Sequence, residues 1–191
     1  MQKSEHRELR AHFRDEKTLL IGNHGTIQFE MNDKTRRLSD GTVVNKGVLI
    51  GTIHILRRLN KHNSNKFEFS LALMIDFLDG MLGLIDLLKK GRFADAVAFD
   101  GVSHLAKTSF ARELGFDIFD ISIANKLVTQ FLARKHSDFL SEESWMVQQR
   151  KMGQAMISRQ KLLDDESIFE MKLIKLQNLQ QRRSDRSARL N

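Results

Sequence analysis

AVAFDGVSHLAKTSFARELGFDIFDI, residues 96–121, is the stretch of sequence that decides the fold. With the two residues before it, this stretch predicts a strand over 94–100, a helix from Ser103 to Leu114 that stops at Gly115, and a second strand over 116–121. The pattern is a βαβ unit over residues 94–121, whose two strands we expect to run parallel through a right-handed crossover. The sequence therefore predicts an α/β fold, with α+β as the alternative.

The N-terminal half supplies further strands for a small mixed sheet. Residues 18–21 and 26–31 are rich in strand-forming side chains and flank a turn at 22–25, which predicts a hairpin. Asp40-Gly41 indicates a second turn, and the β-branched run from Val48 to Leu56 is the strongest strand of this half. Gly51 inside that run indicates a bulge.

A long amphipathic helix is predicted over 69–89 and is expected to pack on the sheet. Its apolar residues recur at helical spacing, and Asp76, Asp79 and Asp86 share the opposite face. We interpret these carboxylates as the solvated side of the helix, because hard cations usually draw ligands from loops or from several elements. The histidines show no spacing typical of a zinc site, so we predict no metal.

The C-terminal part is predicted to be a helical arm. A helix is expected over 123–134, and after Ser141, a predicted N-cap, the chain is expected to be helical to its end with a break near residues 163–165. Leu162, Phe169, Leu173 and Leu176 form a narrow apolar stripe, which favours docking on another helix, a second copy of the chain or a protein partner through the 142–180 helices. The predicted organisation is a charged arm (1–16), an α/β domain (17–138), and a helical hairpin or arm with a basic tail (139–191).

Composition excludes several classes of protein. The 191 residues are 41% hydrophobic and 29% charged, as in a globular domain, and they include no cysteine, which excludes disulfides and thiol chemistry. The first residues lack the apolar core of a secretory signal, and the best candidate span, residues 67–88, carries four carboxylates that would be costly in a bilayer. We expect a soluble protein without a transmembrane segment, and by elimination a cytoplasmic one.

The loop of the βαβ unit is the predicted ligand site. Asp100, Ser103, His104 and Lys107 follow a strand and open a helix, which is a common position for a ligand in α/β proteins. His54, in the strand over 48–56, is a further candidate. We expect a small anionic or sugar-like ligand here. The alternative is a purely structural role, in which Ser103 only caps the helix and Lys107 is solvated.

No reaction is specified by these residues. The run from Gly101 to Thr108 resembles a phosphate-binding loop, but Ala106 occupies the position of its second glycine. No nucleophile elbow is present, and Asp100, Ser103 and His104 are too close in sequence to form a triad. We therefore predict no catalytic residues and no cofactor, and favour binding over catalysis while leaving an enzymatic role open.

The basic C-terminus supports a different function. The net charge is +7, and residues 172–191 hold six basic residues against one acid. Arg182, Arg183, Arg186 and Arg189 would let this helix bind nucleic acid or an anionic membrane surface, so that the chain acts as an adaptor. No aromatic residue follows Phe169 to stack on bases, and a solvated helix end is the simpler interpretation.

Three features together resemble the YkoP-like domain family. They are DGTVVNKGVLIGTIH over residues 40–54, the long helix, and the segment from Gly101 through LGFDIFDI at 114–121. The resemblance covers about residues 38–125. It implies an α/β domain that is sometimes attached to polysaccharide deacetylases and has no settled activity of its own, and it thereby hints at a cell-envelope context.

Overall fold

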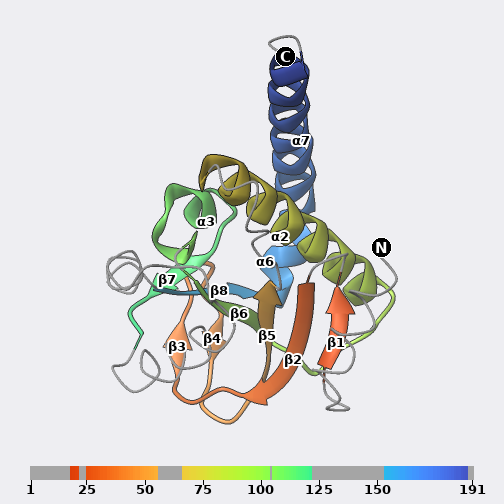
Figure 1. Ribbon diagram of the computed structural model, residues 1–191. Coiled ribbons are helices and arrows are strands. Elements are labelled where there is room, and N and C mark those ends of the chain that lie inside the picture. Colours follow the sequence, from red (N-terminus) through yellow and green to blue (C-terminus); the bar gives the residue numbers. More distant parts are fainter. Residues whose placement is uncertain (1–17, 22–24, 56–65, 104, 122–152, 189–191) are drawn as a thin grey trace.

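A mixed six-stranded sheet forms the centre of the molecule (Figure 1). The computed structural model describes residues 18–21, 25–55, 66–103, 105–121 and 153–188. The strand order is β1-β2-β5-β6-β8-β7, with a separate two-stranded hairpin of β3 and β4. The fold is α/β, as the sequence predicts. The strands are β1 (Thr18–Ile21), β2 (Gly25–Met31), β3 (Arg36–Arg37), β4 (Val43–Val44), β5 (Leu49–Ile55), β6 (Ala98–Ser103), β7 (Asp117–Phe119) and β8 (Gly153–Ser158). The helices are α2 (Lys66–Lys89), η1 (Leu105–Lys107), α3 (Ser109–Glu113), α6 (Arg159–Asp164) and α7 (Glu166–Ala188).

The N-terminal strands agree with the sequence prediction, except at Gly51. β1 pairs with β2, and β2 with β5, both antiparallel. The β2–β5 register is continuous from Gly25↔Ile55 to Met31↔Leu49, so Gly51 does not form a bulge. The glycine is instead required by close packing, because a Cβ at this position would lie 2.6 Å from both Ile27 Cδ1 and Phe99 Cδ1.

The predicted βαβ unit is split by a strand from the C-terminal region. β6 pairs parallel with β5 and antiparallel with β8, and β7 pairs antiparallel with β8. β6 and β7 therefore run in the same direction, but they are separated by β8. The helix between them is shorter than predicted: Ser103 is the last residue of β6, and α3 begins only after its N-cap residue, Thr108.

The expectation of continuous helix after Ser141 is wrong for residues 153–158. These residues form β8, which lies in the interior of the sheet between β6 and β7. Backbone hydrogen bonds to two neighbouring strands outweigh the weak strand propensity of GQAMIS. The predicted helix over 123–134, the N-cap at Ser141 and the start of the arm lie outside the described residues. The predicted break at 163–165 is confirmed, because Asp165 separates α6 from α7.

One face of the sheet packs against the helices and forms the main core. α2 lies along this face and contributes Leu78, Met81, Leu84 and Ile85, all fully buried, to a cluster that includes Ile27 and residues of β6 and β8. The acidic face of α2 is not uniformly solvated as predicted. Asp76 is only 9% exposed, Asp79 is half-buried and Asp86 is exposed, because the helix is covered on more than one side.

The opposite face of the sheet is partly covered by the β3–β4 hairpin. Leu38 and Val44 of the hairpin region pack on Ile50, Ala98 and Met156 of β5, β6 and β8. This second, smaller core covers only the end of the face that carries those three residues. Most of the strand residues on the remainder of the face carry polar side chains.

Two helices end at left-handed glycines, as the sequence predicts. Gly91 follows α2 with φ +75°, and Gly115 follows α3 with φ +82°. In each case the residue after the glycine donates its backbone N–H to a carbonyl five positions back, Leu87 or Ala111, which is the Schellman arrangement. At Gly115 the positive φ is the main constraint, because the atoms that a Cβ would approach there are the movable ends of the Lys161 and Asp165 side chains.

The apolar stripe of the C-terminal region packs within the chain. Leu162 and Phe169 are fully buried, and Leu173 and Leu176 pack against the same core. The contact partners include α2 and the Phe116 ring, whose centroid lies 6.4 Å from that of Phe169. Lys89 of α2 pairs with Glu166, and Glu113 of α3 pairs with Lys172. The stripe is thus covered without a second copy of the chain. In the described part of the chain, no helix has the length and apolarity needed to span a membrane.

Replacing Phe169 tests whether the docking of α7 stabilises the fold. Phe169→Ala removes a fully buried ring, so we expect a loss of about 3 to 5 kcal/mol in the free energy of unfolding. Met171→Ala is the control, because Met171 is 64% exposed on the same helix and should change stability by less than about 0.5 kcal/mol. Denaturant unfolding of both variants measures the difference. Equal stabilities would show that the ring contributes nothing.

Candidate functional site

The face of the sheet opposite the helices carries a row of polar side chains. Strand register places Gln28 opposite Thr52, Thr26 opposite His54, and Thr52 beside Asp100. Because side chains alternate between the faces of a strand, all of these lie on the same face. Glu30 of β2 and Gln154 of β8 complete the row. We call this set, formed by Thr26, Gln28, Glu30, Thr52, His54, Asp100 and Gln154, the polar face.

Asp100 is the centre of the polar face. It is only 3% exposed, and its carboxyl group has two hydrogen-bond partners. Thr52 Oγ1 lies 2.8 Å from Asp100 Oδ1, and Gln154 Nε2 donates to Asp100 Oδ2. Burial raises the pKa of Asp100, while the hydrogen bond that Gln154 donates partly opposes the shift. The site therefore holds a carboxyl group that keeps its proton more readily than an exposed aspartate.

Arg36 fixes the orientation of Gln154. Arg36 Nη2 donates to Gln154 Oε1 at 2.7 Å, which leaves the amide nitrogen of Gln154 to face Asp100. Arg36 Nη1 donates to Asn32 Oδ1 at 3.0 Å and to Asp33 Oδ1 at 3.1 Å, and its guanidinium lies over the Phe119 ring. A buried arginine held at this many points acts as a rigid support for the site.

His54 and Thr26 form the other end of the polar face. Burial lowers the pKa of His54, and the charge of Glu30 opposes the shift in part. Thr26, which is 1% exposed, holds a hydroxyl oxygen that has no hydrogen-bond partner, and among the described residues the Nε atom of Arg36 is in the same situation. Buried polar atoms are rarely left unpaired in proteins, so the Thr26 hydroxyl marks a point of this face that lacks a polar partner.

The structure brings together only some of the predicted site residues. Asp100 and His54 both lie on the polar face, on neighbouring strands. Ser103 is three positions after Asp100 in the same strand and lies on the other face, opposite Gly153. His104 lies outside the described residues. The predicted convergence at one helix start is therefore wrong for Ser103, because the strand extends to that residue.

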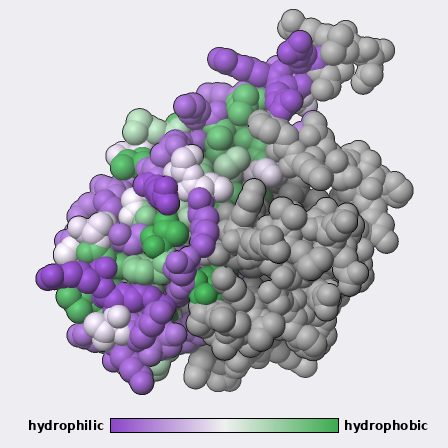
Figure 2. All heavy atoms as spheres, turned by 90° about the vertical axis from the view of Figure 1, so that its left-hand side faces the viewer, coloured by the Kyte–Doolittle hydropathy of each residue, from purple (hydrophilic) through white to green (hydrophobic). Residues whose placement is uncertain are grey.

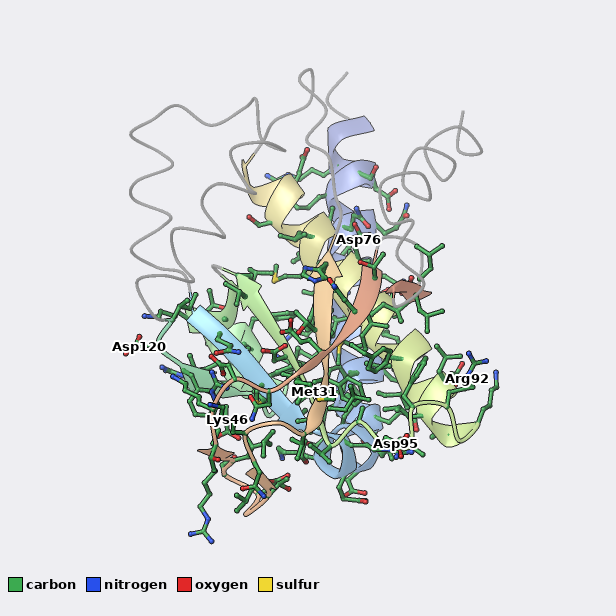
Figure 3. The ribbon with its side chains drawn as sticks, turned by 90° about the horizontal axis from the view of Figure 1, so that it is seen from below. Met31, Lys46, Asp76, Arg92, Asp95 and Asp120 are labelled. Atoms are coloured by element: carbon green, nitrogen blue, oxygen red, sulfur yellow. The ribbon has the colours of Figure 1, made fainter. Side chains whose placement is uncertain are left out.

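Lys107 is engaged away from the polar face. Its Nζ forms an ion pair with Asp120 Oδ1 at 2.7 Å, and Asp120 is strongly exposed, at an edge of the molecule remote from Arg92 and Asp95 (Figure 3). The helix that follows, α3, has five residues. A helix this short offers little dipole, so the predicted anion site at its start lacks its main source of attraction.

Six residues of the site were not predicted from the sequence: Thr26, Gln28, Glu30, Arg36, Thr52 as a partner of Asp100, and Gln154. The alternation in residues 26–30 could have indicated the polar face, because Thr26, Gln28 and Glu30 alternate with Ile27 and Phe29. Nothing local marks Gln154, since its role depends on pairing across 54 residues with Asp100.

The arrangement can hold a polar ligand and move a proton. The residues offer a buried carboxyl group, an exposed carboxylate, two hydroxyls, two amides and an imidazole. Within the described ranges, no group of three or more His, Asp or Glu side chains is placed to hold a metal ion.

Comparisons with known proteins do not extend this description. No family model, no curated protein and no solved structure matches the chain. The fold and the site define an α/β protein with a polar sheet face.

The pH dependence of stability tests the burial of His54. A histidine with a lowered pKa in the folded state binds its proton more readily when unfolded, so stability is lost as the pH falls below the ordinary value of 6.5. Asp100 acts in the opposite direction, because its raised pKa favours the folded state on acidification. We expect His54→Gln to lose less stability than the wild type between pH 7.5 and pH 5.5, measured by urea unfolding. A steeper loss in the variant would contradict this account.

Proposed function

We propose that this protein binds a small, hydroxyl-rich, sugar-like ligand on the polar face of its sheet. The observation that carries the proposal is the cluster around Asp100, in which buried donors and acceptors lie beside the half-buried Thr52, His54 and Gln28. A surface with alternating carboxyl, hydroxyl and amide groups matches the alternating donors and acceptors of a polyol. No reaction is assigned to it here.

The charges near the site favour a neutral over an anionic ligand. Glu30 is exposed and lies next to Asp100, while the nearest cation, Arg36, is already bonded to Asn32, Asp33 and Gln154. An added anion would meet the Glu30 carboxylate, while the unpaired Nε atom of Arg36 is buried. The geometry thus supports the sugar-like part of the sequence-based expectation more than the anionic part.

The unpartnered atoms add independent support. Thr26 Oγ1 and Arg36 Nε are both buried without a hydrogen-bond partner. A ligand hydroxyl bonded to either one would recover the free energy of an unmade hydrogen bond, about 1 to 3 kcal/mol. The resemblance to YkoP-like domains, with its polysaccharide context, agrees with such a ligand. A cytoplasmic location stays a prediction.

Calorimetric titration of the full chain tests this function. Neutral mono- and disaccharides, acidic sugars, sugar phosphates and inorganic phosphate are compared at the same pH. We expect heat from a neutral sugar, and a loss of about 3- to 10-fold in its affinity in Gln28→Ala, which removes one hydrogen-bonding group from the polar face. Gln160→Ala is the matched control, because Gln160 is exposed on α6 and bonds only to Asp164 among the described residues.

Two results would contradict the proposal. Binding of phosphate or acidic sugars in preference to neutral sugars would show that the ligand is anionic. Equal affinities in Gln28→Ala and Gln160→Ala would show that the ligand binds elsewhere.

We infer a second candidate function, in which the C-terminal end of α7 binds polyanions. The observation in its favour is the shape of the molecule: the C-terminal part of α7 projects from the body (Figure 1), and hydrophilic atoms cover this projection (Figure 2). Residues 177–186 are all exposed, and they include Arg182, Arg183 and Arg186. Arg189 lies outside the described residues. A projecting basic helix can reach a nucleic acid backbone or an anionic membrane surface without obstruction by the body.

The salt dependence of polyanion affinity distinguishes this function from a helix end that is only solvated. Each phosphate neutralised by a basic residue adds about 0.9 to the slope of log affinity against log salt for duplex DNA. We expect the combined change Arg182→Ala, Arg183→Ala, Arg186→Ala to lower that slope by about 2 to 3. The control is Lys34→Ala, Arg37→Ala, Lys46→Ala, which removes the same charge from exposed residues of the hairpin region. Equal slopes for both triple variants would show that the three arginines of α7 are only solvated and do not bind the polyanion.

A further inference from the structure

We propose that Glu30, Thr52 and Asp100 form a proton relay, in which one proton is shared between two carboxyl groups through the Thr52 hydroxyl. The relay deepens the site proposed above and rests on that proposed function for the place where the proton is used. It would give the polar face acid–base capability in addition to binding.

The two short contacts of the Thr52 hydroxyl favour a shared proton. Thr52 Oγ1 lies 2.8 Å from Glu30 Oε1 and 2.8 Å from Asp100 Oδ1. A hydroxyl has one hydrogen to donate, so it can satisfy only one of two ionised carboxylates at a time. The second short contact becomes a hydrogen bond only if that carboxyl group is protonated and donates to the oxygen of Thr52. Both contacts are favourable together when the pair holds one proton.

The proton belongs on Asp100 in the resting site. Asp100 is 3% exposed, whereas Glu30 is exposed to water, and burial disfavours the charged form. Asp100 Oδ2 already accepts from Gln154 Nε2, so the proton occupies Oδ1, which faces Thr52. Arg36 prevents the Gln154 amide from turning over, because it donates to the Oε1 atom of Gln154.

The direction of transfer follows from these contacts. Asp100 donates to Thr52 Oγ1, and Thr52 donates to Glu30 Oε1. During transfer the Thr52 proton moves to Glu30 while the Asp100 proton moves to Thr52, which leaves Glu30 protonated and able to act as an acid toward a bound group. The net change is one proton moved from Asp100 to Glu30, with no other bond made or broken.

The other charged groups on this face are few. Arg36 lowers and Glu30 raises the pKa of Asp100 through their charges. His54 on β5 lies two positions after Thr52 and faces Thr26 of β2. Gln154 of β8, which contacts Asp100 from the other side, does not titrate. Glu30 is therefore the acidic neighbour that the relay must use.

The sign of one pKa change tests the relay. The carboxyl carbon-13 resonance of Asp100, assigned by its loss in Asp100→Asn, is followed against pH in the full chain. Thr52→Val removes the hydroxyl but keeps the shape, and Thr52→Ser keeps the hydroxyl. If Asp100 donates to Thr52, the valine variant loses the acceptor of the acid form, and we expect the pKa of Asp100 to fall. The serine variant should keep the wild-type value.

The opposite sign overturns the relay. A rise in the pKa of Asp100 in Thr52→Val would mean that Thr52 donates to an ionised Asp100, and no change would mean that the two groups are uncoupled. The unmodified protein gives a second measurement in case the valine variant does not fold. A protonated carboxyl band that Asp100→Asn removes should be present in the infrared spectrum at a pH of about 5, where an ordinary aspartate is ionised, and its absence overturns the relay. Neither measurement uses a ligand, so failure of the relay and failure of sugar binding are distinguishable.

Discussion

The pairing of β8 with β6 is the interaction on which the rest of the structure depends. The two strands align over six residue pairs, from Ala98↔Ser158 to Ser103↔Gly153. This register brings Gln154 to Asp100 and provides β7 with its neighbour in the sheet. Ser158, at the end of β8, accepts a hydrogen bond from the backbone N–H of Lys161 and thereby caps α6. α7 then continues from α6 onto α2, so sheet, site and helical layer all depend on one strand pair.

The separation of the two sheet faces explains why a polar cluster survives inside the molecule. Ile27, Phe99 and Ile157 are buried under the helices, while Glu30, Asp100 and Gln154 point the other way. Asp100 is costly to bury, and its cost is limited by Thr52 and Gln154, with Arg36 holding the latter. A network that depends on residues from β2, β3, β5, β6 and β8 does not improve the packing of the core.

Local signals in the sequence predicted the local elements correctly. The hairpin of β1 and β2, the strand around Gly51, the long helix α2 and the glycine stops at Gly91 and Gly115 follow from propensity and turn chemistry. β8 was missed because GQAMIS has little strand propensity and its stability comes from two neighbouring strands. The helix was also predicted to begin at Ser103, where β6 in fact continues, and the predicted site was therefore placed at that helix start. Asp100 and His54 were found, but Arg36 and Gln154 meet across 118 residues, which local patterns do not encode.

The strand order has a consequence for the order of events during synthesis. β5 and β6 can pair as soon as both have left the ribosome, yet β7 has no neighbour until residues 153–158 have followed it. Until then β6 keeps one edge unpaired, with its backbone N–H and C=O groups available to any other extended chain. A nascent chain paused between residues 121 and 152 thus exposes the unpaired edge of β6 to other extended chains. Rapid translation of that interval, or a chaperone bound to it, would protect the growing sheet from pairing with the wrong partner.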